Sequence, residues 1–216
     1  MKMKKNAILV LFVLSILSSC SNAPEYLEIV SSKFDDGTPE VICTFKGDTS
    51  IINKINETAY YPSGRKKGEA TFSLGKENGK FQVCFESGNL KQSGFFKDGE
   101  VLGVLTNYYD QIPEQKSIER FYKDGKLFFE RSFHKNGTKM SESNFKNGRE
   151  YGESIWWHSN GIMEIKITDC WNGMETKWYS NGAKRTEGML KDGKRNGVWQ
   201  LWDSLGVKMP PVNYKE

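Results

Sequence analysis

Glycines recur at fixed intervals along most of this chain. Intervals of 9, 11 and 4 residues separate the four glycines Gly79, Gly88, Gly99 and Gly103, and the same intervals separate Gly173, Gly182, Gly193 and Gly197. The intervals add up to 24 residues, so the chain contains a repeat of that length. Repeat units begin near residues 55, 79, 103, 128, 152, 173 and 197, and a degenerate first unit is predicted over residues 28–54.

Aromatic residues occur in phase with these glycines. The fifth residue after the start of a unit, called position 5 here, is aromatic in six of seven units, whereas an aromatic content of 13% would give about one by chance. Position 5 holds Tyr60, Cys84, Tyr108, Phe133, Trp157, Trp178 and Trp202, and position 6 holds Tyr61, Phe85, Tyr109, His134, His158, Tyr179 and Asp203. Because side chains alternate along a strand, we expect an aromatic ladder on each face of a sheet.

Turn dipeptides divide each unit into two short segments. Asn136-Gly137 represents the pairs at one end of the units, and Asp192-Gly193 represents those at the other. Such pairs accept the positive φ angles of tight hairpin turns, and no apolar stripe of helical length occurs in residues 20–216. The chain is therefore predicted to be all-β, an elongated antiparallel meander of about seven to eight β-hairpin repeats, the degenerate one at residues 28–54 and the others over residues 55–216. Pro210 and Pro211 are predicted to end the ladder of strands.

An export signal precedes the repeats. Three lysines are followed by the apolar segment 7–17, which is too short to span a bilayer in a mature protein. Residues 17–20, Leu-Ser-Ser-Cys, resemble the lipobox of bacterial lipoproteins, in which the cysteine is acylated and the signal is cut before it. We expect a signal peptide at residues 1–19, a lipid anchor on Cys20 that includes palmitate, and a tether at residues 20–27. The alternatives are an ordinary secretory signal and an uncleaved anchor.

Charge and location follow from this signal. Removal of residues 1–19 takes away three lysines and no acid, which lowers the formal net charge from +4 to +1. This charge argues against nucleic-acid binding, since it leaves no strongly basic footprint. The predicted location is the bacterial cell envelope, and Ser21 and Asn22 after the cysteine favour the outer membrane.

Residue types for catalysis, metal binding or cofactor binding are not grouped in the chain. Cys84 and Cys170 lie more than three repeats apart, which is too far for a disulfide, and Cys43 is about two repeats from Cys84. The two histidines occupy position 6 of neighbouring units, roughly 10 Å apart, so we expect them to replace aromatic rings rather than to share a metal ion. No nucleophile, zinc or phosphate-loop motif is present, and we expect no enzymatic activity and no cofactor.

Three glutamates leave one catalytic alternative open. Glu130, Glu142 and Glu187 each stand five residues after a turn glycine. A pair of such carboxylates could serve glycoside chemistry, which needs two of them about 5 to 10 Å apart. Residues that recur in phase are explained first by pairing with neighbouring lysines, and equal phase would keep them in separate units.

The repeat resembles the MORN family, and most closely its bacterial variant. The segments that carry the resemblance are residues 181–199 and 136–148, in which Asn-Gly is followed by Glu, an aromatic or aliphatic residue, Lys and Asp-Gly or Asn-Gly. The family includes lipoproteins and chains labelled as antitoxins. The resemblance implies stacked hairpins in a single layer and roles in scaffolding, lipid contact or protein contact, with no catalytic motif to carry over.

The aromatic rows are the feature that we expect to bind a partner. The candidate binding residues are Tyr108, Trp157, Trp178 and Trp202, with a second row formed by Tyr109, Trp156, Tyr179 and Trp199. The same rings could instead serve only as the core of a single-layer sheet. We predict a non-enzymatic, membrane-anchored scaffold that binds a protein or another envelope component. An antitoxin or immunity-type protein and an envelope carbohydrate-binding or carbohydrate-processing protein are the alternatives.

Overall fold

The computed structural model of the protein describes residues 25–215. The predicted signal peptide, residues 1–19, and the predicted lipidation site, Cys20, lie outside the described residues. Residues 20–24 of the predicted tether lie outside them too, and Tyr26 and Leu27 already belong to the first strand.

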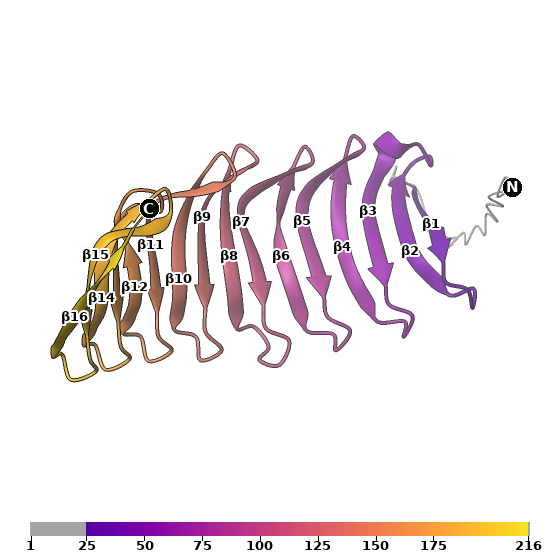
Figure 1. The fold of residues 1–216 in the computed structure, drawn as a ribbon. Helices are drawn as coiled ribbons and strands as arrows, with labels where there is room; N and C mark the ends of the chain where they lie inside the picture. Colours follow the sequence, from indigo (N-terminus) through magenta and orange to yellow (C-terminus); the bar gives the residue numbers. More distant parts are fainter. Residues whose placement is uncertain (1–24, 216) are drawn as a thin grey trace, which may run out of the picture. The chain divides into compact units, whose positions relative to one another are not determined.

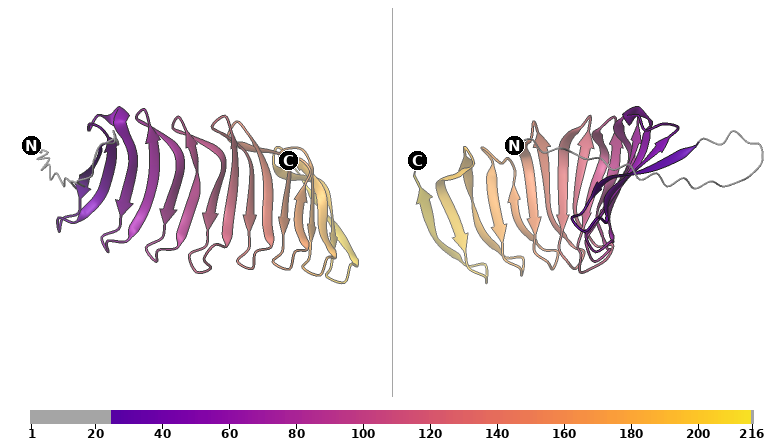
Figure 2. Two further views of the ribbon diagram at one scale, coloured as in Figure 1. Left: turned by 180° about the vertical axis from the view of Figure 1, so that it is seen from behind. Right: turned by 90° about the vertical axis from the view of Figure 1, so that its right-hand side faces the viewer.

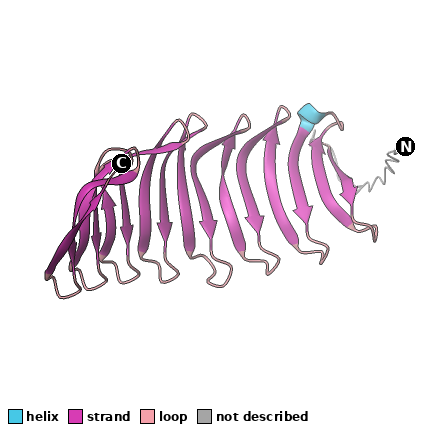
Figure 3. Ribbon diagram, in the orientation of Figure 1, coloured by secondary structure: helices cyan, strands magenta, loops and turns pink. Residues whose placement is uncertain are grey.

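The described chain is a succession of β-strands (Figures 1 and 3). Sixteen strands, β1 to β16, follow one another in the described chain and form eight antiparallel hairpins. The prediction of an all-β antiparallel hairpin meander is confirmed. The one helical element is a short 3-10 turn, η1, and no helix in residues 25–215 is long and apolar enough to cross a membrane.

Two compact units divide the chain after Val101, and each is described by itself. The first unit contains β1 (Tyr26–Lys33), β2 (Pro39–Lys46), η1 (Ile51–Asn53), β3 (Lys54–Tyr60), β4 (Lys66–Ser73), β5 (Lys76–Cys84) and β6 (Leu90–Lys97). β7 (Glu100–Tyr108) leads into the second unit, which continues with β8 (Lys116–Lys123), β9 (Lys126–Phe133), β10 (Lys139–Lys146), β11 (Arg149–Trp157), β12 (Met163–Ile167), β13 (Met174–Trp178), β14 (Lys184–Lys191), β15 (Lys194–Trp202) and β16 (Lys208–Tyr214). Figure 2 shows from two further sides that strands consecutive in the chain lie side by side within each unit.

One edge of the sheet in each unit is closed by five-residue turns. In the turn after β9, the N–H of His134 donates to the carbonyl of Thr138 (2.9 Å), and the N–H of Gly137 donates to the carbonyl of His134 (2.9 Å). Gly137 has a φ of 86°, so the connection is a three-residue loop with a left-handed glycine. The same pair of bonds recurs in the turns that start at Phe34, Tyr61, Phe85, His158, Tyr179 and Asp203.

Most connections at the opposite edge are two-residue turns, and those between β2 and β3 and between β12 and β13 are longer. Asp124 and Gly125 have φ angles of 51° and 68°, and Lys123 pairs directly with Lys126 across them. Two consecutive left-handed residues define the type I′ turn, which matches the twist of the strands. The same geometry occurs at Leu74-Gly75, Asp98-Gly99, Asn147-Gly148 and Asp192-Gly193.

A third kind of glycine starts most units and completes the explanation of the spacing. Gly152 (φ 66°) lies in a bulge of β11, where the register with β10 shifts between Ser143 and Phe145. Gly79 and Gly197 occupy equivalent bulges. Where a unit starts in a bulge, the intervals of 9 and 11 residues therefore run from that bulge to a five-residue turn and then to a type I′ turn, and the interval of 4 residues leads to the next unit. Gly173 instead lies in the loop between β12 and β13 and has no positive φ.

Burial is concentrated in a row of side chains on one face of the sheet. In the second unit this row, two residues after the start of each repeat, includes Leu105, Ser154, Glu175 and Trp199, which are 9%, 0%, 9% and 0% exposed. Trp199 lies against Gly188, where an added Cβ would be 2.3 Å from the indole ring. We call the face that carries this row the first face and the opposite one the second face.

The prolines near the end of the chain lie inside the last strand rather than beyond it. Both residues belong to β16, which pairs with β15 and is the last strand, so the ladder of described strands ends at the strand that carries the prolines, as predicted. A register shift between Trp199 and Leu201 accommodates them, and Gln200 donates its side-chain N–H to the carbonyl of Met209 (2.8 Å). An edge strand tolerates proline because no further strand needs its missing N–H.

Candidate binding surface

The four candidate binding residues end four odd-numbered strands of the second unit. Tyr108 ends β7, Trp157 ends β11, Trp178 ends β13 and Trp202 ends β15, and all four side chains are half-buried. Their preceding neighbours at position 4 are linked by an unbroken series of register partners from Asn107 to Leu201. Since consecutive side chains point to opposite faces, the position 5 rings share the second face.

Lysine and glutamate side chains border these rings. The Lys139 Nζ lies 4.5 Å from the centre of the Trp157 ring and 3.0 Å from a carboxylate oxygen of Glu142. Two repeats on, the Lys184 Nζ lies 5.1 Å from the centre of the Trp202 ring and 2.7 Å from Glu187. The second face thus repeats a unit of ring, ammonium and carboxylate, in which each cation–π contact contributes about 0.5–1 kcal/mol.

The residues at position 6 were predicted to form a ladder on the other face, but they do not. They begin the turns at this edge of the sheet, a longer one at Tyr109, and the polar atom of each Tyr or His ring reaches the carbonyl of position 5 in the next repeat. The donors and acceptors are Tyr61 Oη to Cys84 (2.8 Å), Tyr109 Oη to Phe133 (2.7 Å), His134 Nε2 to Trp157 (2.7 Å), His158 Nε2 to Trp178 (3.0 Å) and Tyr179 Oη to Trp202 (3.0 Å). A carbonyl only accepts, so each histidine carries its proton on Nε2 in these bonds.

The second predicted row, Tyr109, Trp156, Tyr179 and Trp199, is therefore not one surface. Tyr109 and Tyr179 lie in turns, whereas Trp156 and Trp199 lie on the first face at different positions of their repeats. Trp199 is fully buried and donates its indole N–H to the carbonyl of Met189 (3.2 Å). It belongs to the core.

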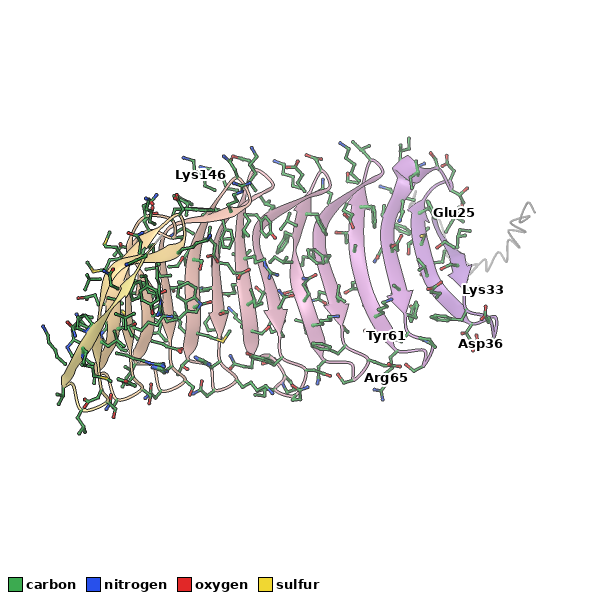
Figure 4. All side chains as sticks on the ribbon, in the orientation of Figure 1. Glu25, Lys33, Asp36, Tyr61, Arg65 and Lys146 are labelled. Atoms are coloured by element: carbon green, nitrogen blue, oxygen red, sulfur yellow. The ribbon has the colours of Figure 1, made fainter. Side chains whose placement is uncertain are left out.

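Asparagine side chains link the same turns to one another. The side-chain amide of Asn136 donates to the carbonyl of Ser159 (2.7 Å), and that of Asn160 donates to the carbonyl of Ser180 (2.7 Å). In the first unit Arg65 makes the comparable bond to the carbonyl of Glu86 (2.8 Å); Tyr61 and Arg65 are labelled at the lower margin of Figure 4. These bonds hold the strand ends that carry the position 5 rings.

The three glutamates considered for catalysis do not share one face. Glu142 pairs in register with Arg131, and Glu130 pairs with Ser143, which places Glu130 on the first face and Glu142 on the second. The expectation of equal phase is wrong for Glu130, because Gly125 belongs to a type I′ turn whereas Gly137 belongs to a five-residue turn. Glu130 pairs with Arg120 (2.6 Å).

Glu119 is the most buried glutamate of the second face. It accepts hydrogen bonds from Lys116 (2.6 Å) and from Arg131. Burial alone would raise the pKa of its carboxyl, but the two cations outweigh burial and lower that pKa below its ordinary value. The pair of cations therefore keeps a nearly inaccessible carboxylate ionised.

Other chemistry is sparse in the described chain. Cys43, Cys84 and Cys170 are free. Residues 25–215 contain no group of three or more His, Cys, Asp or Glu side chains that could hold a metal ion. A shallow cavity of about 250 Å³ in the first unit is lined by Glu57, Phe81 and Phe96 among others.

Comparison with known proteins supports the repeat. Residues 130–147, which span the end of β9, its turn and β10, match the family model described as the MORN repeat variant. No curated protein shows significant similarity to the chain. The matched segment is one hairpin, and equivalent hairpins recur through both units. The chain thus carries a MORN-type repeat over this segment, and a repeat of this kind suggests a binding scaffold.

Proposed function

We propose that the protein is a non-enzymatic lipoprotein of the bacterial cell envelope, anchored in the outer membrane, whose second face binds a protein partner. The observation that supports binding is the row of position 5 rings, which are neither fully exposed nor fully buried and are bordered by lysines and glutamates. Surfaces that mix aromatic rings with satisfied charges are typical of protein contacts.

A rigid scaffold is favoured by how the rings are held. The carbonyls of Trp157, Trp178 and Trp202 each accept a hydrogen bond from the turn of the preceding repeat. The strand ends are therefore fixed before a partner arrives, which lowers the entropy lost on binding. Glu142 and Glu187 are engaged by lysines on the same surface, an arrangement that suits contact better than proton transfer.

Anchoring is supported by the sequence at the amino terminus. The lipobox-like segment 17–20 follows an apolar stretch of signal-peptide length. Several acyl chains on Cys20 would hold the domain on a membrane, since two chains already suffice for stable attachment.

The test is capture of the partner from the native envelope by the acylated protein and its variants, with the untagged strain as control. We expect Trp157→Ala and Trp202→Ala to reduce the yield of one protein that wild type recovers. Leu205→Ala, at a side chain 86% exposed in the last turn, should leave the yield unchanged. Equal yields from all three variants would show that the second face is not the binding surface.

A further inference from the structure

Like charges face each other at the type I′ turns of the second unit. Direct register pairs join Lys123 to Lys126, Lys146 to Arg149 and Lys191 to Lys194. All six side chains are exposed, and we call them the cationic edge. Like charges directly opposite in a sheet are destabilising, so these pairs cost the fold stability.

The cationic edge differs from the other lysines of the unit. Lys116, Lys139 and Lys184 each pair with the glutamate three residues on. In contrast, no ion pair within residues 25–215 engages Lys123, Lys126, Lys146, Arg149 or Lys194. Lys146 is labelled at the upper margin of Figure 4. In the first unit the type I′ turn at Leu74-Gly75 has no such pair, because Ser73 lies opposite Lys76.

An exposed aromatic ring accompanies each pair. Phe128 and Tyr151 stand two residues after Lys126 and Arg149, and they are 48% and 47% exposed. Trp171, 48% exposed, lies in the loop between β12 and β13, and its carbonyl accepts the N–H of Gly193 (2.9 Å) in the turn between Lys191 and Lys194. These rings are more exposed than those of position 5.

A cavity adjoins the last pair. Its volume is about 340 Å³, and it is lined by Lys191, Asp192, Lys194, Arg195, Asn196 and Lys215, four cations against one acid. The Arg195 guanidinium is held in place because it donates to the Tyr214 hydroxyl (3.0 Å) and to Glu175 (3.3 Å). A positioned guanidinium among ammonium groups attracts carboxylate or phosphate oxygens.

We propose that the cationic edge binds a linear acidic polysaccharide. The first two pairs are two strands apart, about 10 Å, and the third is four strands further on, about 20 Å, so the edge offers cation pairs along a line at one and two hairpin spacings. Lysine and arginine would pair with the acid groups of such a chain, while the exposed rings would pack on the apolar C–H faces of its sugars. The cation pairs alone fit any polyanion; the added rings favour one built from sugar rings.

The proposal rests on the proposed function only for its location, since an exported protein meets envelope polysaccharides and not nucleic acid. The surface is a different one from the position 5 row. Trp178→Ala, which alters that row, should therefore leave polysaccharide binding unchanged. If edge variants bind normally while Trp178→Ala loses the protein partner, the present proposal alone fails.

The experiment measures binding of the full-length protein, in detergent, to polygalacturonate as the acidic probe and to dextran as the neutral one. We expect binding to polygalacturonate only, weakening between about 50 and 200 mM salt because exposed charges are screened. The double variants Lys146→Ala/Arg149→Ala and Lys191→Ala/Lys194→Ala should each weaken it about fivefold or more. Trp171→Ala should weaken it and Trp171→Phe should restore it. Lys76→Ala in the first unit is the matched control and should have no effect.

Thermal melting separates binding from a structural role. Removal of like-charge repulsion should leave the melting midpoint of both double variants unchanged or raise it. A lowered midpoint together with weaker binding would assign the edge to stability and overturn the proposal. It would be overturned equally by unchanged polygalacturonate binding in both double variants, or by tighter binding to oligothymidylate or to anionic lipid vesicles than to polygalacturonate.

Discussion

Replacement of Gly188 by alanine tests how the core of the second unit is packed. The added Cβ would lie 2.3 to 2.5 Å from three atoms of the Trp199 ring, whereas ordinary contacts are longer than about 3.4 Å. The ring must therefore move by about 1 Å. Because Trp199 is fully buried and donates to Met189, this movement strains the packing and weakens the hydrogen bond.

The expected cost is about 2–4 kcal/mol of unfolding free energy, from overpacking of about 1–3 kcal/mol and a weakened hydrogen bond of about 1 kcal/mol. Urea denaturation of wild type, Gly188→Ala, Trp199→Leu and the double variant measures this cost and the coupling between the two residues. The smaller leucine should relieve the clash, so alanine should cost much less in its presence. A cost below about 0.5 kcal/mol for Gly188→Ala, or the same cost in both backgrounds, would refute this packing.

Three further predictions concern a turn, the aromatic row and a buried carboxylate. Leu74 is 80% exposed and has a φ of 49° in a type I′ turn, so Leu74→Asn should stabilise the protein by about 0.5–1 kcal/mol. The control is Leu205→Asn, because Leu205 is similarly exposed in a turn but is not left-handed, and it should leave thermal melts unchanged. Trp178→Ala should cost about 2–4 kcal/mol because complete repeats flank it, and Trp202→Ala should cost distinctly less; equal losses would contradict a contribution from the flanking repeats. Glu119→Gln should lower the unfolding free energy at pH 7 and make it depend less on acid pH. The lowered pKa of the Glu119 carboxyl stabilises the fold fully above its ordinary pKa of 4.5, and this stabilisation is lost as the pH falls through the pKa in the folded state. Unfolding curves between pH 7 and about pH 3 check this, and parallel acid dependence in wild type and variant would contradict it.

The glycine spacing was enough to predict the hairpins, since most of the spaced glycines lie in a bulge or a turn that needs a left-handed residue. The position 5 row could be predicted from the same phase. The role of position 6 could not be predicted in this way. Tyr61, His134 and Tyr179 share a ring with a polar atom at its far end, but Phe85 at the same position has no such atom. The sequence did contain a sign of this role, because position 6 is Tyr or His in five of the seven repeats.

Turn types and register shifts explain the remaining errors. Gly125 and Gly137 belong to different kinds of turn, so equal distance from a glycine did not place Glu130 and Glu142 on the same face. The contact between Gly188 and Trp199 also depends on a shift, between Glu187 and Met189. The like-charge pairs were visible as Lys-Asp-Gly-Lys and Lys-Asn-Gly-Arg around the turns, but only direct pairing across a type I′ turn shows their cost.

Acylation of Cys20 is the central claim of the proposed function, and one variant tests it directly. Wild type and Cys20→Ala are expressed in the native host with a labelled fatty acid, and membrane and soluble exported fractions are compared. We expect labelled wild type in the membrane fraction, extracted only by detergent, and unlabelled Cys20→Ala in the soluble exported fraction. A Cys20→Ala protein that remains labelled and membrane-bound would contradict the anchor.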